Sequence, residues 1–184
     1  MLSVFINYLT AVLAVGAVAV YSRKTPLSVL LRYFTTLSNL FCAAACLTVG
    51  TARLAGMTGY GVLVFKFVAT VSVIVTLLTV LIFLGPQFGY KVLSSGPDLF
   101  LHLVCPLLAA VSWLTLDHTA MPLLHGLLGV LPVALYGLVY LRKVVFKEAW
   151  KDFYGFNRNG HWRLSFVVML FATAALSLMV WGVS

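Results

Sequence analysis

Six apolar runs, each close to the length that a helix needs to cross a bilayer, account for nearly all of the 184 residues. A hydrocarbon core is about 30 Å thick and requires about 20 consecutive apolar residues in a helix. We expect the spans at Val4–Tyr21, Leu27–Gly50, Gly61–Leu84, Leu99–Leu116, Pro122–Leu141 and Arg163–Gly182. Because a helix pairs its own backbone groups in lipid, the runs predict an all-α, polytopic membrane protein. We expect a single six-transmembrane-helix bundle over residues 1–184.

The composition agrees with this fold class, since 62% of the residues are hydrophobic and only 9% are charged. A typical soluble domain has about 25% charged residues. The connectors are short apart from residues 142–162, so no soluble domain remains to carry separate chemistry. Cys42, Cys46 and Cys105 all lie inside expected spans without metal-type spacing, and we expect neither a metal ion nor a cofactor.

Basic residues fall almost entirely on one side of the expected topology. The connectors after the first, third and fifth spans contain Arg23, Lys24, Lys91, Arg142, Lys143, Lys147, Lys151, Arg158 and Arg163. The opposite connectors contain only Arg53. The positive-inside rule therefore places the basic connectors in the cytoplasm and both termini on the other side. We interpret the net charge of +8 as this bias together with attraction to anionic lipid heads, and we expect no nucleic-acid partner.

A polar octet, residues 32–39 (RYFTTLSN), interrupts the second apolar run. Polar groups in hydrocarbon cost free energy unless they find a partner or line a cavity, so the octet is a functional-site hypothesis. If the second span is one helix from Leu27, a rise of about 1.5 Å per residue puts Thr35 and Thr36 roughly 12–14 Å into the membrane. His102 is expected about one helical turn inside from the same face. The octet and His102 therefore share one half of the bilayer.

Helical spacing joins the polar residues of the octet into a stripe that should face the bundle interior, with Arg32, Thr36 and Asn39 at i, i+4 and i+7. Small polar residues also serve as packing between membrane helices, and a lone histidine in an apolar helix is often a packing residue, so both interpretations stay open. Two features favour chemistry at His102. An imidazole moves protons near neutral pH, and Pro106 frees the His102 carbonyl from its usual hydrogen bond.

A hydroxyl and an imidazole on neighbouring helices are the minimum for nucleophilic acyl transfer. A threonine would attack a carbonyl, His102 would take and return the proton, and amide or hydroxyl donors would stabilise the oxyanion. Asp98, one turn before His102, is expected to orient the imidazole only weakly. The candidate catalytic residues are Thr35, Thr36 and His102, and the candidate substrate- or oxyanion-binding residues are Arg32, Ser38 and Asn39.

Three short motifs occur in order along the chain: residues 32–40 (RYFTTLSNL), residues 102–108 (HLVCPLL) leading to Trp113, and residues 152–156 (DFYGF). Together they resemble bacterial six-helix members of the androgen-induced protein family, which includes the androgen-dependent regulator of tissue factor pathway inhibitor. Animal members of that family are intramembrane threonine hydrolases of fatty acid esters of hydroxy fatty acids. The resemblance implies that Thr35 or Thr36, with His102, cleaves a lipid or fatty-acyl ester in a bacterial inner membrane.

The chain departs from the family pattern at two places. Asn39 stands where the animal proteins carry an acidic residue, and the interval from His102 to Pro106 is one residue shorter than theirs. Alignment on residues 33–35 selects Thr35 as the nucleophile, whereas alignment through residues 39–40 selects Thr36.

Two further functions stay open. Lys66 and His125 belong to the outer half of the bilayer, where we expect them to pair with each other or extend outward. In a small transporter or channel subunit, the polar stripe would continue through both leaflets, with Lys66 and His125 as the outer half of the path. In a non-catalytic lipid-binding protein, the hydroxyls would only pack. The connector at residues 142–162 combines aromatic and basic residues, which predicts an amphipathic interfacial segment that is either an anchor or a lid over the cytoplasmic entrance.

Overall fold

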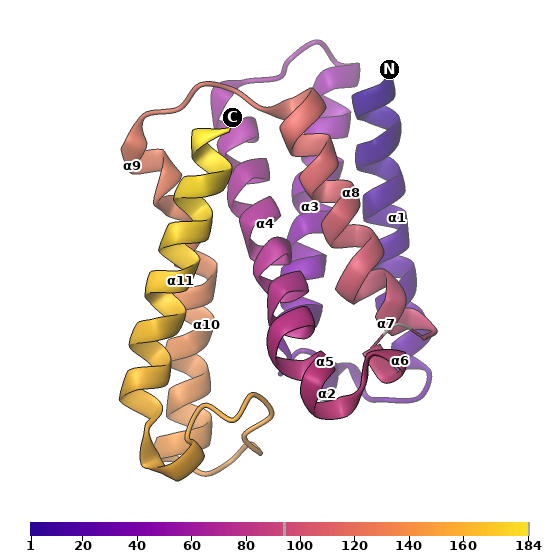
Figure 1. The fold of residues 1–184 in the computed structure, drawn as a ribbon. Coiled ribbons are helices and arrows are strands. Elements are labelled where there is room, and N and C mark those ends of the chain that lie inside the picture. Colours follow the sequence, from indigo (N-terminus) through magenta and orange to yellow (C-terminus); the bar gives the residue numbers. More distant parts are fainter. Residues whose placement is uncertain (94, 184) are drawn as a thin grey trace.

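A computed structural model describes residues 1–93 and 95–183 and arranges them as a bundle of long helices (Figure 1). The helices long and apolar enough to cross a membrane are Leu2–Ser22, Phe34–Leu54, Tyr60–Phe88, Pro97–Asp117, Leu123–Phe146 and Trp162–Gly182. This result confirms the all-α fold class and the six spans expected from the sequence. The protein is an integral, multi-pass membrane protein.

Several spans are built from consecutive helical segments. The first half of the chain contains α1 (Leu2–Ser22), α2 (Leu27–Leu30), α3 (Phe34–Leu54), α4 (Tyr60–Thr79), η1 (Val80–Leu84), α5 (Gly85–Phe88) and α6 (Tyr90–Leu93). The fourth span consists of α7 (Pro97–Leu99), η2 (Phe100–Val104), α8 (Cys105–Ser112) and η3 (Trp113–Asp117). The fifth consists of α9 (Leu123–Gly126), η4 (Leu128–Val130), α10 (Leu131–Leu141) and η5 (Arg142–Phe146). A short turn, η6 (Arg158–Gly160), precedes α11 (Trp162–Gly182).

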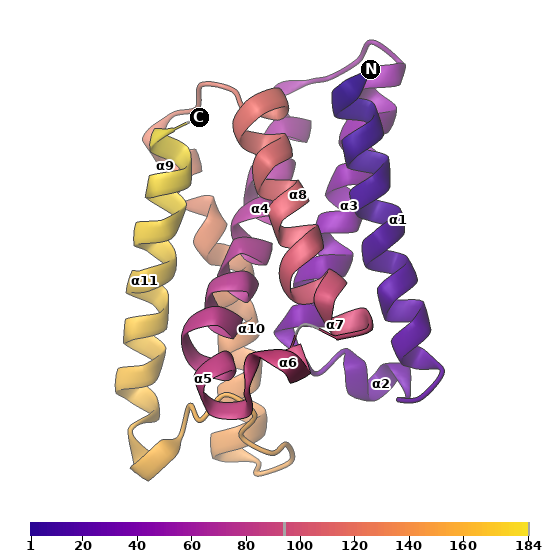
Figure 2. The same ribbon diagram turned by 45° about the vertical axis from the view of Figure 1, so that its right-hand side comes forward.

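Four spans form a tightly packed group made of α1, α3, α4 and the fourth span, and α10 and α11 form a pair beside α4 (Figures 1 and 2). The core of the group contains mainly small side chains, including Ala11, Ala14, Cys42, Ala43, Ala45, Cys46, Ala69, Cys105 and Ala109. Small residues let membrane helices approach closely. In lipid the hydrophobic effect does not drive helices together, so their association depends on such close packing.

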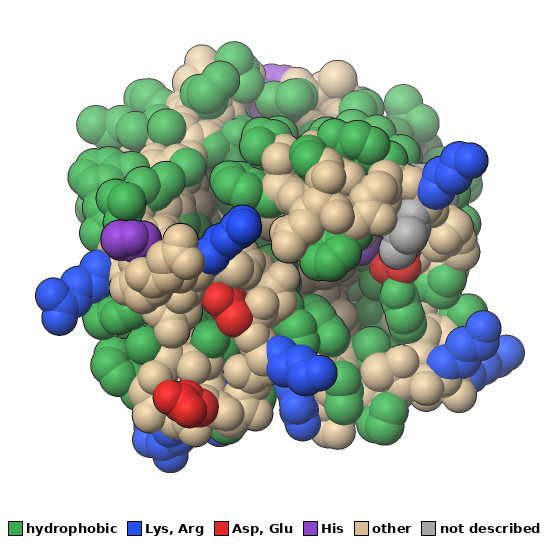
Figure 3. All heavy atoms as spheres, turned by 60° about the horizontal axis from the view of Figure 1, so that its bottom comes forward, with side chains coloured by type: hydrophobic (Ala, Val, Ile, Leu, Met, Phe, Trp, Pro, Cys, Tyr) green, Lys and Arg blue, Asp and Glu red, His purple; other side chains and the backbone are tan. Residues whose placement is uncertain are grey.

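Both termini lie at one end of the bundle, which we call the outer end (Figure 1). The opposite end, called the inner end, carries α2, α5, α6 and the connector that follows η5. Lys and Arg side chains extend from the inner end (Figure 3). The positive-inside rule makes the inner end the expected cytoplasmic face.

The second span is not the continuous helix that the sequence predicted from Leu27. Helix α2 ends at Leu30 and α3 begins at Phe34, with Tyr33 in an extended conformation (φ −95°, ψ 132°). The assumption of one helix, from which the depth of Thr35 and Thr36 was predicted, is therefore wrong, because both lie in the first turn of α3. Backbone groups freed by such a break need partners inside a membrane protein.

Two tyrosine hydroxyls supply those partners. The Tyr136 hydroxyl donates to the carbonyl oxygen of Arg32 at 2.8 Å, and the amide of Phe34 donates to the Tyr154 hydroxyl at 3.2 Å. Tyr136 lies on α10 and Tyr154 on the connector before α11. The break in the second span is thus stabilised by two segments about a hundred residues further along the chain.

Tyr136→Phe is expected to lower the free energy of unfolding by about 0.5–1.5 kcal/mol, because it leaves the Arg32 carbonyl without its donor. Unfolding in mixed micelles on titration with a denaturing detergent measures the change. Tyr60→Phe is the matched control, since Tyr60 is exposed at the outer end. Equal stability of the two variants would show that the Tyr136 bond does not hold the break.

Candidate functional site

The first turn of α3 carries both candidate nucleophiles, with Thr36 buried and Thr35 half-buried. Tyr33 precedes the helix and provides no side-chain cap. The amides of Thr35 and Thr36 have no hydrogen-bond acceptor among residues 1–93 and 95–183. Because amides in a first turn have no intrahelical partner and lie at the positive end of the helix dipole, this turn suits a negatively charged oxygen.

His102 is buried within η2, a π-helical turn in which the amide of Cys105 bonds to the carbonyl of Phe100. Its Nδ1 lies 3.7 Å from Asp98 Oδ1, which is longer than a hydrogen bond. Asp98 is itself held by the Tyr21 hydroxyl, which donates to Oδ2 at 2.6 Å. The carboxylate is thus fixed beside the imidazole. Single π-helical turns occur frequently at functional sites.

Asn39 links the threonine turn to the histidine turn. Its Nδ2 donates to the carbonyl of Thr35 at 2.8 Å and to the carbonyl of Leu101, the residue before His102, at 2.9 Å. Both amide hydrogens are therefore engaged, one within α3 and one across to the fourth span. The buried Oδ1 has no partner within the described residues, so Asn39 offers the site an acceptor and not a free donor.

The other two candidate residues, Ser38 and Arg32, make contacts to α4 and α10. The hydroxyls of Ser38 and Thr76 are 2.8 Å apart, so Ser38 connects α3 to α4. Ser38 also bonds to the carbonyl of Thr35 at 3.1 Å. Arg32 is half-buried in the break before α3, and its backbone is fixed by Tyr136. The structure thus brings Asn39 into contact with the histidine turn, whereas Ser38 bonds to α4.

An apolar groove of about 310 Å³ runs along the inner part of α3. Its lining residues are Leu31, Phe34, Leu37, Ser38, Phe41, Pro132, Leu135, Tyr136, Val139 and Trp150. The groove lies between α3 and α10, and Thr35, Thr36 and His102 do not line it. Its lining is almost entirely apolar, which is what an acyl chain requires.

The connector before α11 folds back onto the threonine turn. The ring of Phe153 packs on Tyr33 with centroids 4.6 Å apart. Asp152 holds the connector by accepting from the Tyr140 hydroxyl at 2.9 Å and from the amides of Phe156 and Asn157 at 2.8 and 2.7 Å.

Tyr154 places a buried hydroxyl of this connector against the start of α3. Burial raises the pKa of the hydroxyl, and hydrogen bonds with the Phe34 amide and the Tyr136 and Thr35 side chains oppose the rise. The connector therefore covers the inner end of α3.

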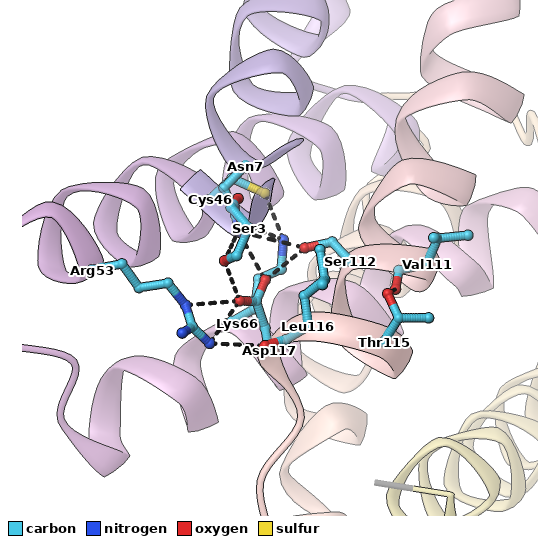
Figure 4. A network of polar contacts seen from close by, with 10 residues as sticks. All are labelled: Ser3, Asn7, Cys46, Arg53, Lys66, Val111, Ser112, Thr115, Leu116 and Asp117. Carbon is cyan, nitrogen blue, oxygen red and sulfur yellow. Dashed lines mark hydrogen bonds and ion pairs between the residues drawn. The ribbon is translucent and has the colours of Figure 1, made fainter. Parts of the chain in front are cut away.

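A second polar cluster, which the sequence reasoning missed, lies at the outer end of the bundle (Figure 4). We call it the outer polar network, and it consists of Ser3, Asn7, Cys46, Arg53, Lys66, Ser112 and Asp117. At its centre, the fully buried carboxylate of Asp117 accepts from Ser3 at 2.6 Å, from Ser112 at 2.6 Å and from Asn7 at 2.8 Å. Arg53 completes the set with an ion pair of 2.9 Å.

Lys66 belongs to the same network and is fully buried. Its ammonium donates to Asn7 Oδ1 at 2.8 Å and lies 2.8 Å from Cys46 Sγ. The prediction that Lys66 pairs with His125 or extends outward is wrong, because Asn7 bridges Lys66 to the Asp117 carboxylate inside the bundle. His125 instead packs edge-on against Tyr60 at 5.5 Å. An acidic residue directly after an apolar run, Asp117, was the signal that could have revealed this cluster.

No protein family, curated protein or solved structure matches the chain. In the part of the chain that the structure describes, no group of three or more His, Cys, Asp or Glu side chains is arranged to hold a metal ion. The fold and these contacts define a polytopic membrane protein with two buried polar centres, one at each end of the bundle.

Proposed function

We propose that the protein is an intramembrane hydrolase of lipid esters, with Thr35 or Thr36 as nucleophile and His102 as general base. The observation that carries the proposal is the hydrogen bond from Asn39 of α3 to the carbonyl of Leu101, which joins the helix that bears both threonines to the turn that bears His102. Placing a hydroxyl and an imidazole on adjoining turns is the requirement for this chemistry.

The reaction proceeds in two steps. The threonine oxygen attacks the ester carbonyl carbon while His102 takes the hydroxyl proton, and the oxyanion is stabilised by the free amides of the first turn of α3. His102 then returns the proton to the departing alkoxide, which leaves an acyl-threonine. Water, deprotonated by His102, attacks the acyl-threonine, and His102 returns that proton to the departing threonine oxygen as the fatty acid is released. The Asp98 carboxylate stabilises the imidazolium formed in each step.

The substrate class follows from the groove and from the family resemblance. We assign the apolar groove between α3 and α10 to an acyl chain, and we assign Arg32, in the break before α3, to the carboxylate of a fatty acid ester of a hydroxy fatty acid. The connector over the inner end acts as a lid, with Trp150 lining the groove. The bilayer supplies the substrate laterally.

Purified protein is incubated with a fatty acid ester of a hydroxy fatty acid, and the released fatty acid is quantified by mass spectrometry. We expect His102→Ala and the double variant Thr35→Ala, Thr36→Ala each to reduce release by at least about 100-fold. The two single threonine variants identify the nucleophile. Thr48→Ala is the matched control, since Thr48 is exposed on α3 and bonds only to its own helix. Release that survives both inactivating changes overturns the proposal.

A specific observation favours a second candidate function, proton or ion permeation. Ionisable side chains lie inside the bundle in both halves, with buried Lys66 and Asp117 toward the outer end and buried His102 beside half-buried Asp98 toward the inner end. Such residues mark ion pathways in membrane proteins. Flux in proteoliposomes that is lost in Lys66→Met, in a preparation without ester hydrolysis, would support this candidate and exclude the hydrolase.

A further inference from the structure

The outer polar network has an unbalanced charge. It contains two cationic side chains, Arg53 and Lys66, and one carboxylate, Asp117. All of the contacts to Asp117 come from donors, and Asn7 connects it to Lys66. With the Cys46 thiol neutral, one positive charge is left over, and an uncompensated charge in a low-dielectric interior is costly. A bound anion at the surface of the network would remove that cost.

Arg53 is the cation of the network that is exposed at the surface. Its side chain is 31% exposed, whereas the Asp117 side chain is fully buried. Arg53 Nε donates to Asp117 and Nη2 donates to the Leu116 carbonyl at 2.9 Å. These bonds fix the guanidinium, and within the described residues no acceptor contacts its remaining nitrogen, Nη1. The guanidinium of Arg53 is therefore fixed in place, and its Nη1 is available to donate to a bound anion.

A pocket of about 420 Å³ opens beside Arg53. Its lining residues are Met1, Ser3, Val4, Arg53, Leu54, Gly56 and Thr58. The pocket lies where α3 ends and α1 begins, which is head-group level for helices of this length. Apolar side chains of Met1, Val4 and Leu54 flank the polar ones, so the lining suits an amphiphile with a charged head.

We propose that this pocket binds the phosphate of an anionic lipid head group, such as that of phosphatidylglycerol. A phosphodiester carries a single negative charge, which equals the surplus of the network. Arginine is the side chain best suited to phosphate oxygens. The apolar flank distinguishes a lipid from free phosphate, which shares the same head chemistry. This site is independent of the proposed hydrolase centre at the inner end.

The test is lipid retention measured by native mass spectrometry of the detergent-purified protein, with phosphatidylglycerol, phosphatidylcholine and inorganic phosphate as separate probes. Thr58→Trp places a large side chain in the pocket and leaves both residues of the Arg53–Asp117 pair in the sequence, and Arg53→Gln removes the donor. We expect each to weaken phosphatidylglycerol binding by about tenfold or more, the scale of one charged hydrogen bond. Arg23→Gln, which removes an exposed cation at the inner end, should leave it unchanged.

Each outcome decides the proposal. A preference of the wild type for phosphatidylglycerol over phosphatidylcholine that is lost in Thr58→Trp supports a lipid site. If Arg53→Gln fails to fold, the Thr58→Trp variant is sufficient for this test. If inorganic phosphate displaces phosphatidylglycerol and binds with the same affinity, the pocket is an anion site whose ligand is the free ion. Equal retention of both lipids by the wild type, or retention unaffected by Thr58→Trp, overturns the proposal.

Discussion

Replacing Asp117 with alanine is expected to lower the free energy of unfolding by about 3–5 kcal/mol, as for other buried ion pairs that lose one partner. The substitution leaves Arg53 and Lys66 without a counter-charge. It also removes the acceptor for the Ser3 and Ser112 hydroxyls. An average interhelical hydrogen bond in a membrane protein contributes only about 0.6 kcal/mol. The larger value is expected here because a charge, and not only a hydrogen bond, loses its partner.

Titration with a denaturing detergent measures this change, and Glu148→Ala is the control because Glu148 is an exposed acid at the inner end. Asp117→Asn should fall between the two, since it keeps an acceptor oxygen and loses only the charge. If Asp117→Ala unfolds at the same detergent fraction as Glu148→Ala, the outer polar network does not stabilise the bundle.

The six spans could be predicted from the sequence because the length of an apolar run is a local property. The first run was expected at Val4–Tyr21, and the helix extends over Leu2–Ser22. The last was expected at Arg163–Gly182, and the helix extends over Trp162–Gly182. Bilayer thickness sets both lengths without reference to any partner segment.

The break before α3 was not predictable in the same way. No proline or glycine occurs in residues 27–49, and nothing local in Leu31 or Tyr33 excludes a helix. The hydroxyls of Tyr136 and Tyr154, which satisfy the backbone on either side of the break, come from segments that only the tertiary fold brings there.

The candidate site, too, could be predicted only in the features that depend on a single segment of the chain. The shared membrane half of the octet and His102 followed from topology, and the Asn39–Leu101 hydrogen bond brings the two segments into contact. Their chemical roles stay predictions. The outer polar network depends on the rotation of four helices about their axes, which places Asn7 between Lys66 and Asp117. A hydropathy pattern counts each of these residues as an unfavourable polar group in its own segment and contains no information about its partners on other helices.

Gly129 allows the α10–α11 pair to approach α4, and Gly129→Leu is expected to cost about 3 kcal/mol, the upper end of the range for overpacking. Even a single Cβ at this position would overlap the Ser177 hydroxyl of α11 and crowd the Val71 side chain of α4. Ser177 cannot move away freely, because its hydroxyl donates to the Gly126 carbonyl. The pair must therefore separate from α4 or bend.

Gly16→Leu is the matched control for this change, because a Cβ at Gly16 of α1 meets nothing within 4 Å. Both variants replace a helical glycine with the same side chain, so their difference isolates the close approach from helix propensity. We expect Gly129→Leu to unfold at a lower detergent fraction and Gly16→Leu to match or exceed the wild type. Crosslinking between cysteines introduced on α4 and α11 should fall only in Gly129→Leu. Equal stability and equal crosslinking in the two variants would show that Gly129 does not set the packing of α10 and α11 on α4.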